Sequence, residues 1–300
     1  MQTKGTFFMS EYAIEIKNVT CKFDGFLLDN ISFSVPSGSI MGFVGRNGAG
    51  KTTTIRSMIN SVTPDSGEIN IFGLDNRKYE HKIKEDIAVV FDEIPFPDTL
   101  TPLQLGKVFA GLYKSWDGKQ YLSMLERFSL PQKKRIRDFS RGMKMKLQIC
   151  TALSHNAKLL IMDEATSGLD PVVRSEMLDV FQEFICDEEH SIIMSSHITS
   201  DIERIADTVT FIDNGKILIS GVTTEILDDH GILKCSAEEV SNISDEDIVS
   251  VRIGEFGADV MIRNRIKCSG KYSRFIINNT TLDEILLFYV RKGKGREWSV

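Results

Sequence analysis

Gly45-Arg46-Asn47-Gly48-Ala49-Gly50-Lys51-Thr52 fits the pattern G-x-x-x-x-G-K-[ST], which is typical of a phosphate-binding loop. Its glycines let backbone N–H groups cradle phosphate oxygens, Lys51 can reach the β- and γ-phosphates, and the Thr52 hydroxyl can bind Mg²⁺. The flanks agree, because Ser39–Val44 is apolar like a buried strand and Thr53–Val62 has the spacing of a helix, whose N-terminus favours phosphate. We therefore expect residues 45–53 to bind a nucleotide.

The bulk composition excludes several classes of protein. A length of 300 residues suggests one large domain, or one domain with a small appendage. The net charge of −6 gives no reason to expect nucleic acid as a partner. No apolar run is long enough to cross a bilayer, so any membrane connection is expected to come through a partner. The five cysteines are scattered and fit neither a metal site nor a disulfide framework, which indicates a reducing cytosol.

Strand and helix patterns alternate through the first two thirds of the chain, which predicts a largely parallel α/β sheet. A helix-rich insert near residues 95–155 is expected to form a subdomain on that sheet, with helical spacing from Thr101 to about Leu130 and again over Met143–Leu153. The other expected strands are Tyr12–Lys17, Leu27–Val35, Glu68–Phe72, Ile87–Phe91, Lys158–Met162, Ser191–Ser195 and Thr208–Ile212.

The pattern changes after about Gly221, where short strand-like segments follow one another. Thr281-Leu282-Asp283-Glu284 then reads as a capping box ahead of a helix over Ile285–Val290. We expect residues 1–220 to form the nucleotide-binding domain and residues 221–300 to form a small α+β accessory domain.

Two adjacent acids, Asp163 and Glu164, follow the apolar run Leu159–Met162. The run predicts a strand buried on both faces, so the acids are expected at the carboxyl edge of the sheet, where α/β proteins bind ligands. Asp163 is placed to hold Mg²⁺, and Glu164 is placed to polarise an attacking water as general base.

Two further motifs and one histidine complete an ordered set. Ser140-Arg141-Gly142-Met143 precedes the acids, Ser167-Gly168-Leu169-Asp170-Pro171 follows them, and His197 comes just after the strand Ser191–Ser195. This set resembles the ATP-binding subunits of ABC transporters from roughly Glu15 to Gly221. The resemblance implies a phosphate-loop NTPase core of the ABC type, with an antiparallel β portion and a helical subdomain.

The resemblance also implies roles for single residues. Phe23 matches the aromatic residue that stacks on adenine. Ser140 and Gly142 match the signature that contacts the γ-phosphate of ATP held by the opposite subunit. Asp170 matches the loop acid that communicates across the dimer, and His197 matches the histidine that contacts the γ-phosphate and positions water.

Two positions depart from the family pattern. The chain has Asp92-Glu93 where the family commonly has a glutamine that touches Mg²⁺ and the membrane partner, so Asp92 is expected to serve the metal and to influence turnover. The signature ends in Met143 where the family usually has glutamine.

The function implied is that of an ATP-hydrolysing motor subunit of an ABC transporter, expected to be an exporter, with ATP and Mg²⁺ as cofactors. It would pair with a second ATP-binding subunit, of the same or another kind, and bind separate membrane-spanning permease subunits at the inner face of the cell membrane. Asp228-Asp229-His230-Gly231 and Thr281–Lys292 resemble the ends of Gram-positive exporters of the bacitracin-resistance kind. Two alternatives stay open: a soluble ABC ATPase acting on ribosomes or DNA, and an ATP-gated regulatory module with low turnover. Neither the cargo nor the direction of transport follows from the sequence.

Overall fold

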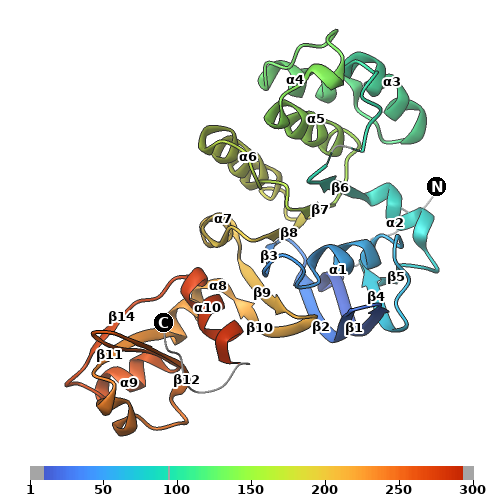
Figure 1. The fold of residues 1–300 in the computed structure, drawn as a ribbon. Coiled ribbons are helices and arrows are strands. Elements are labelled where there is room, and N and C mark those ends of the chain that lie inside the picture. Colours follow the sequence, from blue (N-terminus) through green and yellow to red (C-terminus); the bar gives the residue numbers. More distant parts are fainter. Residues whose placement is uncertain (1–9, 94, 293–300) are drawn as a thin grey trace.

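The computed structural model describes residues 10–93 and 95–292, and its centre is a mixed sheet in the order β10-β9-β3-β8-β7-β6 (Figure 1). The strands from β9 to β6 are parallel, and β10 runs antiparallel to β9 at one edge. The expected parallel sheet is therefore confirmed. Its strands are β3 (Ile40–Val44), β6 (Ile87–Phe91), β7 (Leu159–Asp163), β8 (Ser191–Ser196), β9 (Thr208–Asp213) and β10 (Lys216–Val222).

A second sheet, entirely antiparallel, has the order β2-β1-β4-β5. Between the two sheets lies an apolar core, and Ile55 and Met58 of α1 (Lys51–Met58) belong to it. This core fixes α1, and therefore the loop before it, against the carboxyl ends of the central strands. The strands of this sheet are β1 (Tyr12–Phe23), β2 (Phe26–Pro36), β4 (Ser66–Ile71) and β5 (Leu74–Asp75).

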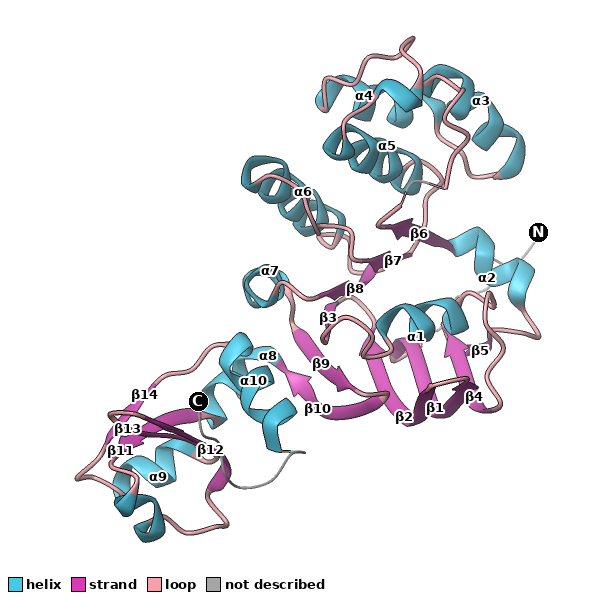
Figure 2. Cartoon of the chain, in the orientation of Figure 1, coloured by secondary structure: helices cyan, strands magenta, loops and turns pink. Residues whose placement is uncertain are grey.

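The helical subdomain forms a lobe of its own (Figure 2). The helix pattern expected from Thr101 to Leu130 is in fact two helices, because Asp117 accepts hydrogen bonds from two backbone N–H groups and starts a new helix. Thr101 caps the first of them in a capping box with Gln104. The helices are α3 (Pro102–Leu112), α4 (Gly118–Arg127) and α5 (Arg141–Leu153), with a short 3₁₀ turn over Ile136–Asp138, and α2 (Glu80–Asp86) precedes β6.

Two helices, α6 (Pro171–Phe184) and α7 (Thr199–Ile205), follow the segments that contain Asp170 and His197. α6 begins directly after Asp170, whose carboxylate accepts from the backbone N–H groups of Val172 and Val173. α7 begins shortly after β8. Both helices contribute apolar side chains to a core shared with β7, β8 and the helical subdomain.

The C-terminal region contains a third sheet, in the order β12-β13-β11-β14. One face carries α9, and the other packs against α10. The expected capping box is confirmed, since Thr281 and Glu284 exchange side-chain to backbone hydrogen bonds. Whether the boundary near residue 220 separates two independent domains stays a prediction. The elements are α8 (Thr223–Asp229), β11 (Gly231–Cys235), a 3₁₀ turn over Glu238–Asn242, β12 (Ile248–Gly254), β13 (Gly257–Ile262), α9 (Arg265–Lys271), β14 (Ile276–Asn278) and α10 (Leu282–Lys292).

His230 is buried where α8 meets α10. Its Nδ1 lies 2.8 Å from the Ile226 carbonyl oxygen and its Nε2 lies 2.9 Å from the Tyr289 hydroxyl, an arrangement suited to a neutral ring with the proton on Nδ1. Burial lowers the pKa of His230 below its ordinary 6.5, with Arg263 adding to the effect and Asp229 opposing it.

We expect His230 to make the fold less stable in weak acid. Because its pKa is lower in the folded chain, the unfolded chain takes up the proton first, so stability is lost as the pH falls through about 6.5. The variant His230→Gln should flatten this loss. Thermal unfolding of both proteins between about pH 7.5 and pH 5.5 tests the prediction, and parallel curves would contradict it.

Candidate functional site

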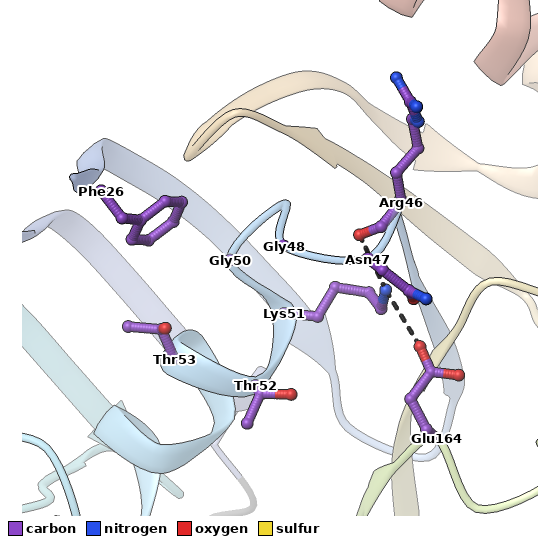
Figure 3. A pocket seen from close by; sticks show the side chains of 9 residues that line it. All are labelled: Phe26, Arg46, Asn47, Gly48, Gly50, Lys51, Thr52, Thr53 and Glu164. Atoms are coloured by element: carbon purple, nitrogen blue, oxygen red, sulfur yellow. Dashed lines mark hydrogen bonds and ion pairs between the residues drawn. The ribbon is translucent and has the colours of Figure 1, made fainter.

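The phosphate loop forms a pocket of about 360 Å³ at the end of β3 (Figure 3). Gly50, at φ 115°, provides the left-handed turn into α1, where any side chain would be strained. A Cβ on Gly45 would lie 2.3 Å from the Ile212 carbonyl oxygen, so this position also requires glycine. The lining residues are Phe26, Arg46, Asn47, Gly48, Gly50, Lys51, Thr52, Thr53 and Glu164. Gly45 and Ala49, also expected to bind the cofactor, belong to the loop but not to this lining.

The Lys51 side chain is almost completely buried in this loop. Its Nζ donates to the carbonyl oxygens of Gly45 and Arg46, at 2.6 and 3.2 Å, and lies 3.0 Å from Oε1 of Glu164. The structure therefore brings together the loop lysine and the expected general base, which are more than a hundred positions apart in the sequence.

The two acids sit at the end of β7, as the sequence predicts. Glu164 has φ 54°, a left-handed conformation that costs a non-glycine residue roughly 1–3 kcal/mol and is typical of functional sites. Ser195 on the neighbouring strand β8 holds both acids, because its hydroxyl donates to Asp163 at 2.7 Å and accepts from the Glu164 N–H at 3.0 Å. Sequence reasoning missed Ser195, although its place two residues before His197 was a usable signal.

His197 contacts the pocket residue Glu164 but is not itself among the residues that line the pocket. Its Nδ1 donates to Oε2 of Glu164 at 2.6 Å, while Oε1 of the same carboxylate faces Lys51. The histidine side chain is 43% exposed. The Glu164 carboxylate therefore contacts Lys51 through one oxygen and His197 through the other.

The signature segment lies away from this pocket. Ser140 caps α5 and accepts from the Met143 N–H at 3.3 Å. Neither Ser140, Gly142 nor Asp170 is among the residues that line the pocket of the same chain. This separation is what a site shared between two chains requires.

Asp92 pairs with Arg141, the second residue of the signature. Gln148 holds the backbone of Phe91, the residue before Asp92. The Gln148 amide donates to the Phe91 carbonyl oxygen at 3.0 Å and accepts from the Phe91 N–H at 3.2 Å. The Arg141 guanidinium also covers Gly168, where a Cβ would lie 2.7 Å from Nη1. Arg141 therefore connects the signature with the segment after β6 and with the loop that contains Gly168. Asp92 does not line the pocket, and its role as a metal ligand stays a prediction.

Replacing Asp92 with glutamine should raise ATP turnover up to about fivefold and leave ATP affinity unchanged. Both partners of the Asp92–Arg141 pair are about half exposed, and such pairs are worth about 0.2–1 kcal/mol, which limits the effect. Glu183→Gln is the matched control, because the Glu183–Arg127 pair is similarly exposed but joins the helical subdomain to α6, not to the segment after β6. Equal steady-state rates for Asp92→Gln and wild type would refute the prediction.

The aromatic residue at the pocket is Phe26 (Figure 3). Phe23, expected to stack on adenine, is 48% exposed with its ring centroid 6.5 Å from that of Phe26. The two residues flank the Asp24-Gly25 turn between β1 and β2. Adenine stacking by Phe23 stays a prediction. Phe26 is a second aromatic residue, which lines the pocket and was not predicted from the sequence.

The oxygen donors near the loop fit Mg²⁺. Within residues 10–93 and 95–292 no group of three or more His, Cys, Asp or Glu side chains could hold a metal. Mg²⁺ does not need such a cage, because it usually takes one or two protein ligands and completes its shell with water and substrate phosphates. Thr52 in the pocket and the buried Asp163 carboxylate supply that kind of donor set.

Comparisons with known proteins agree with this geometry. The family model described as ABC transporter matches residues 28–167. The linearmycin resistance ATP-binding protein LnrL of Bacillus subtilis is 35% identical over 233 residues, which cover 75% of this chain and 74% of the relative. The chain belongs to the ABC transporter ATP-binding proteins.

Other matches point the same way. The bacitracin transport ATP-binding protein BcrA of Bacillus licheniformis is 38% identical over 194 residues, covering 64% of this chain and 63% of BcrA. A solved structure of an ATP-binding subunit of an ABC transporter covers 70% of this chain and 90% of its own length, with 25% identity and a TM-score of 0.63. A dimeric ATP-binding cassette with ADP and Pi, 19% identical, covers 70% of this chain and 98% of its own, with a TM-score of 0.63, and supports the fold alone.

Membership of this family settles the activity. The chain is an ATP-binding ATPase and acts as the motor subunit of an ABC transporter. The chain spans about two thirds to three quarters of the length of the relatives named here.

Proposed function

We propose that this ABC ATPase powers an exporter and works as two copies held head to tail. The observation that carries the hydrolytic part of the proposal is the contact of Glu164 with both Lys51 and His197, at a pocket that Lys51 and Glu164 line. These residues supply a cation for the phosphates, a carboxylate for the attacking water and a histidine that orients the carboxylate.

Hydrolysis by this site would begin with a rearrangement at Lys51. The γ-phosphate offers the lysine a stronger partner than the loop carbonyls, so Lys51 turns to the phosphate and releases Glu164. Glu164, held by His197 and by its backbone bonds to Ser195, then accepts a proton from the attacking water. Thr52 and Asp163 would hold Mg²⁺, and the bound ion would supply positive charge next to the phosphate oxygens.

Two copies would supply two complete sites. The chain carries the phosphate loop and the signature, yet Ser140 does not line the phosphate pocket of its own chain. A two-fold arrangement would bring Ser140 and Gly142 of one copy to the γ-phosphate bound by the other. This proposal makes the second ATP-binding subunit another copy of the same chain.

The relatives support a membrane partner and an outward direction. Their names describe a bacitracin transport protein and a linearmycin resistance protein. No helix within the described residues is long and apolar enough to cross a membrane. We propose separate membrane-spanning subunits, with this chain bound to them at the inner face of the cell membrane.

Affinity capture of the tagged chain from its own cells tests the proposed partner. We expect recovery of a multi-helix membrane protein encoded beside this chain, and we expect that protein to raise the rate of Mg²⁺-dependent ATP hydrolysis. ATP-dependent recovery of ribosomes or DNA, without such a membrane protein, would favour a non-transport role instead.

A further inference from the structure

Helix α7 lies between the catalytic histidine and the C-terminal region. It begins at Thr199, directly after the His197-Ile198 segment, and it packs against α10, drawn in red in Figure 1. The first N–H of α10, that of Leu282, donates to Oε2 of Glu203 on α7 at 3.1 Å. A contact between residues 79 positions apart thus joins the C-terminal region to the helix that follows His197.

The rest of α7 is closely confined. Ile202 lies against Gly42 of β3, where a Cβ would come within 2.1 Å of Cγ2 of Ile202. Arg204 donates to Ser175 at 3.0 Å and to Asp179 at 2.7 Å, both on α6. Because the sheet and α6 hold two sides of α7, the contact with α10 determines the position of its remaining side.

α10 can act as a firm support. Its start is closed by the capping box of Thr281 and Glu284, and Leu282 and Ile285 are completely buried. Glu203 is exposed and provides an acceptor for a backbone N–H that has no partner within the helix. A carboxylate at this end also interacts favourably with the helix dipole.

We propose that Glu203 is a positioning residue for ATP hydrolysis, through which α10 holds α7 and thereby His197 beside Glu164. The proposal rests on the catalytic role proposed above for His197. It gives the C-terminal region a task in the reaction, because any movement of α10 is passed through Glu203 to the catalytic histidine.

The test measures steady-state ATP hydrolysis by the full chain with three substitutions. Glu203→Ala should lower kcat about threefold to tenfold and leave KM for ATP within about twofold, because the phosphate loop is untouched. Glu203→Gln keeps an oxygen acceptor and should retain most of kcat. Glu239→Ala is the matched control, since it removes a carboxylate of the C-terminal region that also accepts from a backbone N–H, that of Ser236, and should leave kcat near wild type.

A double substitution separates positioning from loss of structure. If Glu203 acts through His197, Glu203→Ala should cause no further loss in a His197→Ala background. Wild-type kcat for Glu203→Ala, or equal losses for Glu203→Ala and Glu239→Ala, would overturn the inference. If Glu203→Ala fails to fold, a kcat for Glu203→Gln as low as that of His197→Ala would overturn it. Unchanged turnover in His197→Ala alone would instead refute the proposed role of the histidine.

Discussion

Replacing Glu164 with glutamine should lower ATP turnover at least about a hundredfold, because a positioned general base contributes about 10² to 10⁴ in rate. Glutamine has nearly the same shape but cannot take a proton from water. The phosphate loop is unchanged, so ATP should still bind. If two copies pair as proposed and hydrolysis separates them, the variant should also accumulate as an ATP-bound dimer.

The same ATPase assay supplies the control for Glu164→Gln. Glu183→Gln removes the charge from another ion-paired glutamate, which lies on α6, pairs with Arg127 of α4 and does not line the pocket. This variant should keep near wild-type turnover. If Glu164→Gln retained more than about a tenth of wild-type turnover, this residue would not be the general base.

Replacing Lys51 with alanine should weaken ATP binding about tenfold to a hundredfold, which corresponds to a charge-assisted hydrogen-bond loss of about 1.5–3 kcal/mol. The substitution also leaves the Glu164 carboxylate beside the triphosphate without its cation, and two negative groups then face each other. Turnover should fall with the loss of affinity.

Lys146→Ala is the matched control for Lys51→Ala. Lys146 is also mostly buried and pairs with Glu176 at 2.7 Å, but it lies on α5, outside the pocket lining. Titration with a fluorescent ATP analogue should show a weaker Kd for Lys51→Ala only. The same Kd for Lys51→Ala and wild type would mean that the pocket does not hold phosphate through this lysine.

The nucleotide motifs could be predicted from the sequence because each is local. Gly45–Thr52 specifies its own turn and the helix that follows, and an apolar strand before Asp163 and Glu164 places these acids at the sheet edge. The family resemblance then supplied the order of the remaining segments, and the comparisons confirmed the fold.

Contacts between distant residues could not be predicted in the same way. Asp92 and Arg141 lie 49 positions apart, and neither residue alone indicates a partner. Phe23 and Phe26 are equally aromatic, and only the path of the β1–β2 turn decides which one lines the pocket.

Some missed elements carried weak or overlooked signals. β10 follows Asn214-Gly215, both with positive φ, and this pair is a strong hairpin signal that sequence reasoning did not use. α2 has only one buried residue, Ile83, so it shows no apolar period. The contact of Glu203 with α10 depends on packing between elements far apart in the chain and required the structure.

We propose that ATP joins two copies of this chain through the phosphate loop of one and the signature of the other. Sedimentation velocity of Glu164→Gln, with and without ATP, tests it most directly, because this variant should bind ATP without hydrolysing it. We expect a shift from the one-chain mass of 33.8 kDa to twice that mass with ATP, and no shift when Ser140→Arg is added. A one-chain mass at saturating ATP, with binding verified in the same sample, would contradict it.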